Sequence, residues 1–129
     1  MKPQTVYTRV SIGAGIDSLH DARDATGAVL RALRDRLTPD EAAQAAAQLP
    51  RELKRLWASG RPALRQPIKL HRREFFERVR VDAGLKSLNQ AEMVTDAVFA
   101  ALKEQLSPGE ASDVLAQLPA DLKKQWVRA

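Results

Sequence analysis

Two stretches of the chain carry apolar residues, with one threonine each, at alternating three- and four-residue spacings. The first consists of Leu19, Ala22, Thr26, Val29, Leu33 and Leu37. The second consists of Leu88, Ala91, Thr95, Val98, Leu102 and Leu106. Such spacing places side chains on one face of an α-helix, and the sequence lacks the strict alternation that is typical of strands. The pattern therefore predicts two long core helices.

The two stretches belong to a longer internal repeat. Residues 7–57 align with residues 76–126 without a gap, at a constant offset of 69, and about 23 of about 51 positions are identical. Agreement of this kind at one fixed period indicates a duplicated structural unit. Positions that are kept in both halves are therefore expected to serve the shared fold.

Each half also carries signals for further helices. A first helix is expected over 6–14 and 73–83, with Gly15 and Gly84 as C-terminal stops. Later helices begin at capping boxes, in which a hydroxyl accepts a backbone N–H and the residue three positions on reaches back to the N-cap N–H. The boxes are Ser18-Leu19-His20-Asp21, Ser87-Leu88-Asn89-Gln90, Thr38-Pro39-Asp40-Glu41 and Ser107-Pro108-Gly109-Glu110.

Pro50 and Pro119 separate a third helix from a fourth, so we predict four helices in each half. The expected fold is all-α, a tandem duplication of a four-helix unit packed into one helical bundle of about eight helices. The first repeat spans 1–58, a connector spans 59–73 and the second repeat spans 74–129. One small unit would be marginally stable alone, so the halves are expected to pack together, with two independent units on a linker as the alternative.

The connector carries the whole net charge of the protein. It has five basic residues and no acidic one, while the rest of the chain has 16 of each, which gives the net charge of +5. The five are Arg61, Arg65, Lys69, Arg72 and Arg73. They are the candidate anion- or partner-binding residues. In the simpler interpretation they are solvated cations on a segment that Leu64, Ile68 and Leu70 pin over the bundle.

The sequence contains no motif that indicates catalysis. HExxH, Walker and nucleophile-elbow patterns are absent, and with no cysteine the chain has no thiolate nucleophile and no cysteine-bound zinc. We therefore predict that the protein is not an enzyme and that it has no catalytic residue and no cofactor. No apolar run is long enough for a membrane span, and we expect a cytoplasmic protein.

The best candidates for a metal or acid–base cluster are Asp17, His20, Asp21 and Asp24. At the equivalent positions the second half has Lys86, Asn89, Gln90 and Met93. The shared fold therefore does not require the cluster. We interpret its acidic residues as charges at a helix N-terminus and predict no metal site.

Four pairs of polar or aromatic residues are kept in both halves: Thr26 and Thr95, Gln48 and Gln117, Lys54 and Lys123, and Trp57 and Trp126. We expect the threonines to bond the preceding helical turn and the glutamines to satisfy free backbone groups at a helix junction. The lysines are expected to be solvated. The tryptophans are expected to close the ends of the core rather than to act as exposed binding anchors.

The repeated sequence resembles a known family. Ala28 to Trp57 contains Leu-Thr-Pro-Asp-Glu-Ala and Gln-Leu-Pro-Arg-Glu-Leu, and 106–122 repeats both segments in related form. This pattern is similar to the small bacterial proteins of domain of unknown function family 2267. The resemblance implies a helical bacterial protein, and it brings no assigned activity and no catalytic residues.

These observations favour a non-enzymatic helical module that binds a partner protein or a second copy of itself. It would present either the basic connector or an alanine-rich helical face. The alternative is a nucleic-acid-binding accessory protein that places the connector cations against phosphates. No aromatic residue is interleaved with those cations, so base stacking is not supported. A hydrophobic ligand between the two halves is a third hypothesis.

Overall fold

The computed structural model describes residues 2–60 and 66–129, which form eight helices and no strand. The helices are α1 (Pro3–Ala14), α2 (Leu19–Arg36), α3 (Pro39–Ala47), α4 (Arg51–Ala58), α5 (Arg72–Ala83), α6 (Leu88–Gln105), α7 (Pro108–Ala116) and α8 (Ala120–Arg128). The prediction of an all-α chain is confirmed, and the two long core helices are α2 and α6. α1 begins three residues earlier than predicted because Pro3 is well suited to a first helical turn.

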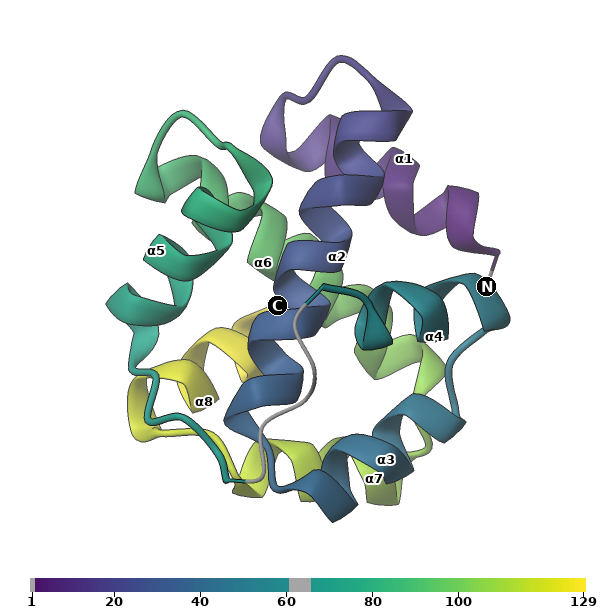
Figure 1. Cartoon of the computed structure of the whole chain (residues 1–129), viewed down its shortest axis with the longest axis vertical. Helices are drawn as coiled ribbons and strands as arrows, with labels where there is room; N and C mark the ends of the chain where they lie inside the picture. Colours follow the sequence, from purple (N-terminus) through teal and green to yellow (C-terminus); the bar gives the residue numbers. More distant parts are fainter. Residues whose placement is uncertain (1, 61–65) are drawn as a thin grey trace.

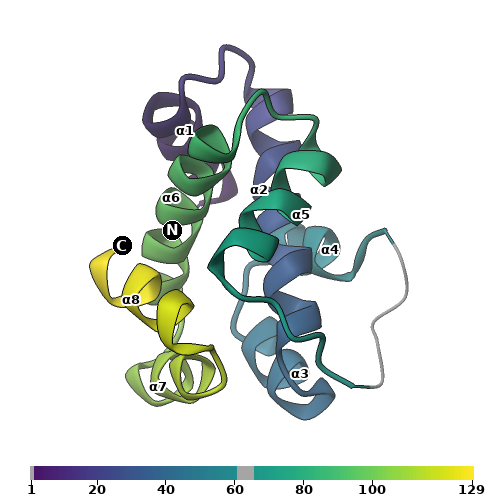
Figure 2. The same ribbon diagram turned by 90° about the vertical axis from the view of Figure 1, so that its left-hand side faces the viewer.

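The first helix of each half packs on the long helix of the other half. α2 and α6 lie in contact at the centre of the bundle (Figure 1). α1 packs against α6 as well as α2, and α5 packs against α2 as well as α6. α3 and α7 lie side by side at one end of the molecule (Figure 2). This exchange joins both halves in one compact bundle and contradicts the alternative of two independent units.

Aromatic side chains from both halves fill the shared core. The ring centroid of Phe75 lies 5.8 Å from that of Phe99, and the ring centroid of Phe99 lies 5.0 Å from that of Trp126. Trp57 and Trp126 are only 5% and 3% exposed. The prediction that the tryptophans belong to the core is therefore confirmed. Lys54 and Lys123 are exposed, as expected.

A basic residue of each long helix caps the last helix of its own half. Arg34 donates from Nη1 to the carbonyl oxygen of Trp57 at 2.8 Å, and Lys103 donates from Nζ to that of Trp126 at 2.7 Å. Positions 34 and 103 are equivalent under the 69-residue offset, and so are the two tryptophans. A cation at the C-terminus of a helix satisfies free carbonyl groups and meets the negative end of its dipole.

Ion pairs between the halves also occur at equivalent positions. Arg9 of α1 pairs with Glu104 of α6 at 2.8 Å, and Arg78 of α5 pairs with Asp35 of α2. The first pair is exposed, whereas the Asp35 side chain is only 2% exposed. A pair that excludes water fixes two helices more firmly than an exposed one, because removal of either partner leaves a buried charge.

None of the four predicted capping boxes is complete among the described residues, and at α6 Gln90 Oε1 accepts from Lys86 N at 3.0 Å instead of from the N-cap Ser87. The boxes at α3 and α7 differ in a further way. The backbone N–H of Glu41 and of Glu110 bonds the N-cap hydroxyl as expected, at 3.3 and 3.2 Å. Neither glutamate reaches back, because the N-cap N–H groups are taken by glutamines of the opposite half. Thr38 N donates to Gln117 Oε1 at 2.9 Å, and Ser107 N donates to Gln48 Oε1 at 2.7 Å. The glutamines thus satisfy free backbone groups, as predicted, but across the two halves.

The two buried threonines do not share one hydrogen-bond pattern. Thr26 donates from Oγ1 to the carbonyl of Ala22 at 2.7 Å, which confirms the expected bond to the preceding turn. Thr95 is equally buried, yet its Oγ1 has no partner among the described residues. The prediction is therefore wrong for Thr95, and its hydroxyl is an unsatisfied polar group in the core.

Candidate functional site

The structure describes three of the five connector cations, and these three do not all lie on the same element. Arg61 and Arg65 lie outside the described residues, so the structure does not test the prediction that they bind an anion or a partner. Lys69 is exposed in the described part of the connector. Arg72 and Arg73 are the first two residues of α5 and are also exposed. The helix thus begins inside the predicted 59–73 connector, and its first turn presents two of the five cations.

The charge of Arg72 is used within the fold. Its Nη2 lies 3.3 Å from Glu92 Oε2, and its guanidinium lies 5.5 Å from the centre of the Phe76 ring. Its backbone N–H donates to Asp121 Oδ2 at 3.0 Å, which fixes the start of α5 near α8. Arg73, by contrast, makes no ion pair with any described residue. Arg73 is therefore free to meet a partner, whereas Arg72 would first have to leave Glu92.

The connector is tied to the bundle where it approaches α5. Ile68 donates its backbone N–H to the carbonyl of Asp35 at 2.8 Å, and its side chain is half-buried against the core. Leu70 is 8% exposed. Two of the three residues expected to pin the segment therefore do so, and Leu64 lies outside the described residues. This anchoring leaves the side chain of Lys69 pointing into solvent.

A groove of about 640 Å³ lies between α2 and α5. Its described lining residues are Arg31, Arg34, Gly60, Arg73, Glu74, Glu77, Arg78, Val81 and Asp82. Fixed ion pairs form most of its walls. Arg31 Nη2 lies 3.0 Å from Asp82 Oδ2, and Asp35 accepts from Arg34 Nε at 2.9 Å and also from Arg78. The groove is therefore rigid and charged, and it combines these pairs with the exposed side chain of Val81.

Two acidic side chains of the groove, Glu74 and Glu77, are held by hydrogen bonds. Glu77 bonds Arg80, and this bond, with the charge of Arg80 and a smaller effect of Arg73, lowers the pKa of Glu77. Glu74 accepts the backbone N–H of His71 at 3.3 Å and so completes a capping box at the start of α5. Carboxylates that are stabilised in this way are weak general bases.

Of the charged residues that line this groove, only Arg73 was identified from the sequence. A signal was present, because arginine is kept at positions 9 and 78 and an acid at positions 35 and 104. In the structure these four positions form the two ion pairs between the halves. The repeat alone shows that the charges are kept, but it does not show that a partner lies in the opposite half. That information comes from the exchange of α1 and α5.

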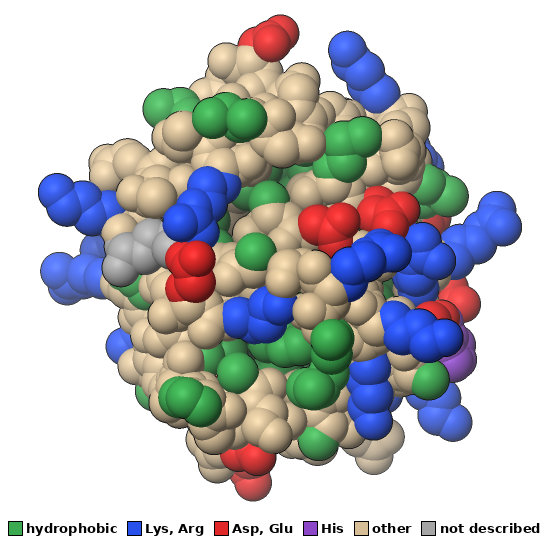
Figure 3. All heavy atoms as spheres, turned by 180° about the vertical axis from the view of Figure 1, so that it is seen from behind, with side chains coloured by type: hydrophobic (Ala, Val, Ile, Leu, Met, Phe, Trp, Pro, Cys, Tyr) green, Lys and Arg blue, Asp and Glu red, His purple; other side chains and the backbone are tan. Residues whose placement is uncertain are grey.

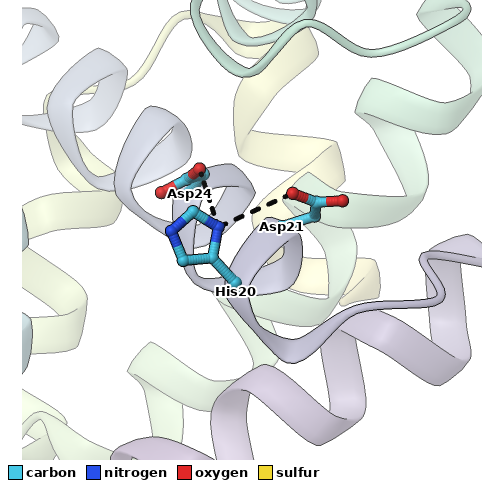
Figure 4. Close-up of side chains that lie close together, drawn as sticks. All are labelled: His20, Asp21 and Asp24. Carbon is cyan, nitrogen blue, oxygen red and sulfur yellow. Dashed lines mark ion pairs between the residues drawn. The ribbon is translucent and has the colours of Figure 1, made fainter.

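Three of the four residues of the candidate cluster at the start of α2, His20, Asp21 and Asp24, come together on the surface, and Asp17 does not belong to the group. His20 Nδ1 lies 3.7 Å from Asp21 Oδ1 and 3.6 Å from Asp24 Oδ2, as the dashed lines in Figure 4 show. All three side chains are more than half exposed. The backbone N–H of Asp21 donates to the Ser18 hydroxyl at 3.1 Å, so the acids surround a capped helix N-terminus. This arrangement suits the interpretation as terminal charges.

Among the described residues, no helix is long and apolar enough to cross a membrane. A family model described as "Uncharacterized conserved protein (DUF2267)" matches residues 4–125, which is nearly the whole chain. A search of curated proteins finds no match.

Proposed function

The chain belongs to the DUF2267 family, and we propose that it is a non-enzymatic interaction module that binds an acidic, partly apolar segment of a partner protein in the groove between α2 and α5. The observation that carries this proposal is the combination of free and fixed charges in that groove. Arg73 is exposed without an ion pair, whereas Arg31 and Arg78 are held in place by acidic partners. A preorganised concave surface loses little conformational entropy on binding.

The chemistry of the partner follows from charge and exposure. The net charge of +5 arises from the connector, which ends at the groove, so an acidic partner is attracted and oriented. Val81 lines the same groove as Arg73, is 64% exposed and offers an apolar contact. Glu74, Glu77 and Asp82 also line the groove and disfavour a uniformly anionic ligand. A protein segment with separate acidic and apolar residues fits this mixture better than a phosphate backbone.

Two observations support a function without catalysis. The described lining of the groove has no histidine, cysteine, serine or threonine, so it lacks the usual nucleophiles and the usual base near neutral pH. The acids that line it are occupied by arginine or by a backbone N–H group. A general base needs a carboxylate whose pKa is raised, and the pKa of Glu77 is lowered.

A nucleic-acid role has weaker support. Arg72 is already paired with Glu92, and Lys and Arg side chains along one edge of the molecule have acidic side chains among them (Figure 3). Such alternation reduces the field that would attract a polyanion. Binding to labelled duplex at low salt, with a steep loss as salt is added, would nevertheless assign the connector to nucleic acid.

Site-specific cross-linking tests the proposed protein partner. The photoreactive residue p-benzoylphenylalanine is introduced at Val81, and at Ile12 as the matched control, because Ile12 occupies the equivalent position of α1 and is 79% exposed. We expect a defined heterologous cross-link from position 81 in host cells, its loss on adding Arg73→Glu, and no such product from position 12. Equal products from both positions would contradict the groove. A product of twice the chain mass would identify a second copy as the partner.

A further inference from the structure

A cluster of acidic side chains lies where α3 meets α7. Glu41, Glu110 and Asp113 each place a carboxylate oxygen within 4.8 Å of the others. Glu41 and Glu110 occupy equivalent positions in the two halves and face one another because glutamines of the opposite half have taken their capping role. The cluster therefore depends on the meeting of the two halves and is absent from either half alone.

This cluster differs from a set of solvated surface charges because Glu110 is buried. Glu110 is only 7% exposed. Its Oε2 atom is buried and has no hydrogen-bond donor among the described residues. The Oε2 atom of Glu41 is buried and lacks a donor as well. A carboxylate in this position is costly unless a counter-charge or a proton compensates for the lost water.

The part of the chain that the structure describes supplies no counter-charge within ion-pair distance. No Lys, Arg or His of the described residues lies within 4.0 Å of the three carboxylates. Burial, the adjacent Glu41 carboxyl and then the charge of Asp113 raise the pKa of Glu110 to about 7. The two buried carboxylate oxygens without a donor therefore call for either a proton or a bound cation. The exposed cluster of His20, Asp21 and Asp24 has no such need, because water solvates it.

We infer that Glu41, Glu110 and Asp113 bind one divalent cation of the oxygen-preferring class, Mg²⁺, Mn²⁺ or Ca²⁺, between α3 and α7. The donor set contains oxygen only, without the histidine or cysteine that zinc and copper favour. Asp113 is exposed, so the cation can enter from solvent and keep water ligands on that side. The cation would link the two halves beside the glutamine bonds to Thr38 and Ser107.

Thermal unfolding with and without each cation tests this site. After treatment with chelator, the full chain is measured at pH 8 with Mg²⁺, Mn²⁺ or Ca²⁺ in turn. At a cation concentration about 100 times its Kd, we expect Tm to rise by roughly 5–10 °C. Loss of the free Mn²⁺ signal in electron paramagnetic resonance should give one bound ion for each chain.

Two variants locate the cation. Glu110→Gln keeps the shape of the side chain and removes its charge, so it should fold and should lose both the rise in Tm and the bound Mn²⁺. The control is the double variant Asp21→Asn and Asp24→Asn, which removes two acids from the exposed cluster and should respond like the wild type.

The proposal fails if millimolar Mn²⁺ neither binds nor changes Tm, and the two carboxyls then share a proton instead. It also fails if Glu110→Gln responds fully or if the control loses the response, because the cation would then lie elsewhere. None of these results bears on the groove between α2 and α5, so the proposed function is tested separately.

Discussion

Raising the pH in the absence of divalent cations should destabilise the protein through Glu110. The pKa of this residue is raised from an ordinary value of 4.5 to about 7, chiefly by burial and then by the neighbouring Glu41. Between these two values the folded state holds a proton that the unfolded state has released. Stability is therefore greatest below pH 4.5 as far as this group is concerned, and it falls as pH rises through 7.

The size of the effect follows from the shift. Each pKa unit corresponds to about 1.4 kcal/mol, so the full shift is worth about 3 kcal/mol. Between pH 5 and pH 8 the part that is lost is about 2–3 kcal/mol, because the unfolded group has already begun to titrate at pH 5. A loss of this size is a large fraction of the total stability of a small domain.

Urea unfolding in chelator at pH 5, 6, 7 and 8 measures this loss. The wild type contains other titrating groups, so the informative quantity is the difference in unfolding free energy between the wild type and Glu110→Gln at each pH. We expect the variant to gain about 2–3 kcal/mol relative to the wild type from pH 5 to pH 8. A difference that stays constant across this range would show that Glu110 titrates normally, and the interpretation of the α3–α7 cluster would be wrong.

Four further substitutions test the packing of the fold. Asp35→Ala should lower the unfolding free energy by about 3 kcal/mol in urea titrations, because it leaves two arginines of the core without their shared carboxylate. Thr95→Val should be neutral or stabilising by calorimetry, whereas Thr26→Val should cost about 1 kcal/mol, because only Thr26 loses a hydrogen bond. Gln117→Ala should cost about 1 kcal/mol in thermal unfolding, because an N-cap N–H loses its acceptor. Equal effects of the two threonine changes, or a silent change at position 35 or 117, would contradict the corresponding contact.

Local signals in the sequence were sufficient to predict the helices. The left-handed Gly15 and Gly84 end α1 and α5 as expected, with φ values of 64° and 65°. The hydroxyls of Ser18 and Ser87 accept the predicted backbone N–H groups at the starts of α2 and α6. These signals act within one helical turn, so the sequence contains both partners at a fixed spacing.

The sequence could not reveal which half supplies each long-range partner. A charge of the same sign at the equivalent position of both halves, as for Arg9 and for Glu104, is compatible with any arrangement of two helical units. Arg9 and Glu104 meet because α1 packs on the long helix of the other half. The groove follows from the same exchange, because α2 and α5 belong to different halves. The role of the connector cations remains a prediction, since two of the five lie outside the described residues.

The glutamates at positions 41 and 110 show how a long-range partner can overturn a correct local rule. A capping box needs an acceptor at this position for the N-cap N–H, and Gln117 and Gln48 provide that acceptor from the other half. Glutamine at 41 and 110 would then pack equally well without two carboxylates facing each other. Both halves nevertheless carry glutamate, and the cost appears in the raised pKa of Glu110. Both glutamates lie in the first turn of their helices, where a carboxylate meets the positive end of the dipole, and the proposed cation would offset the remaining cost of bringing the two together.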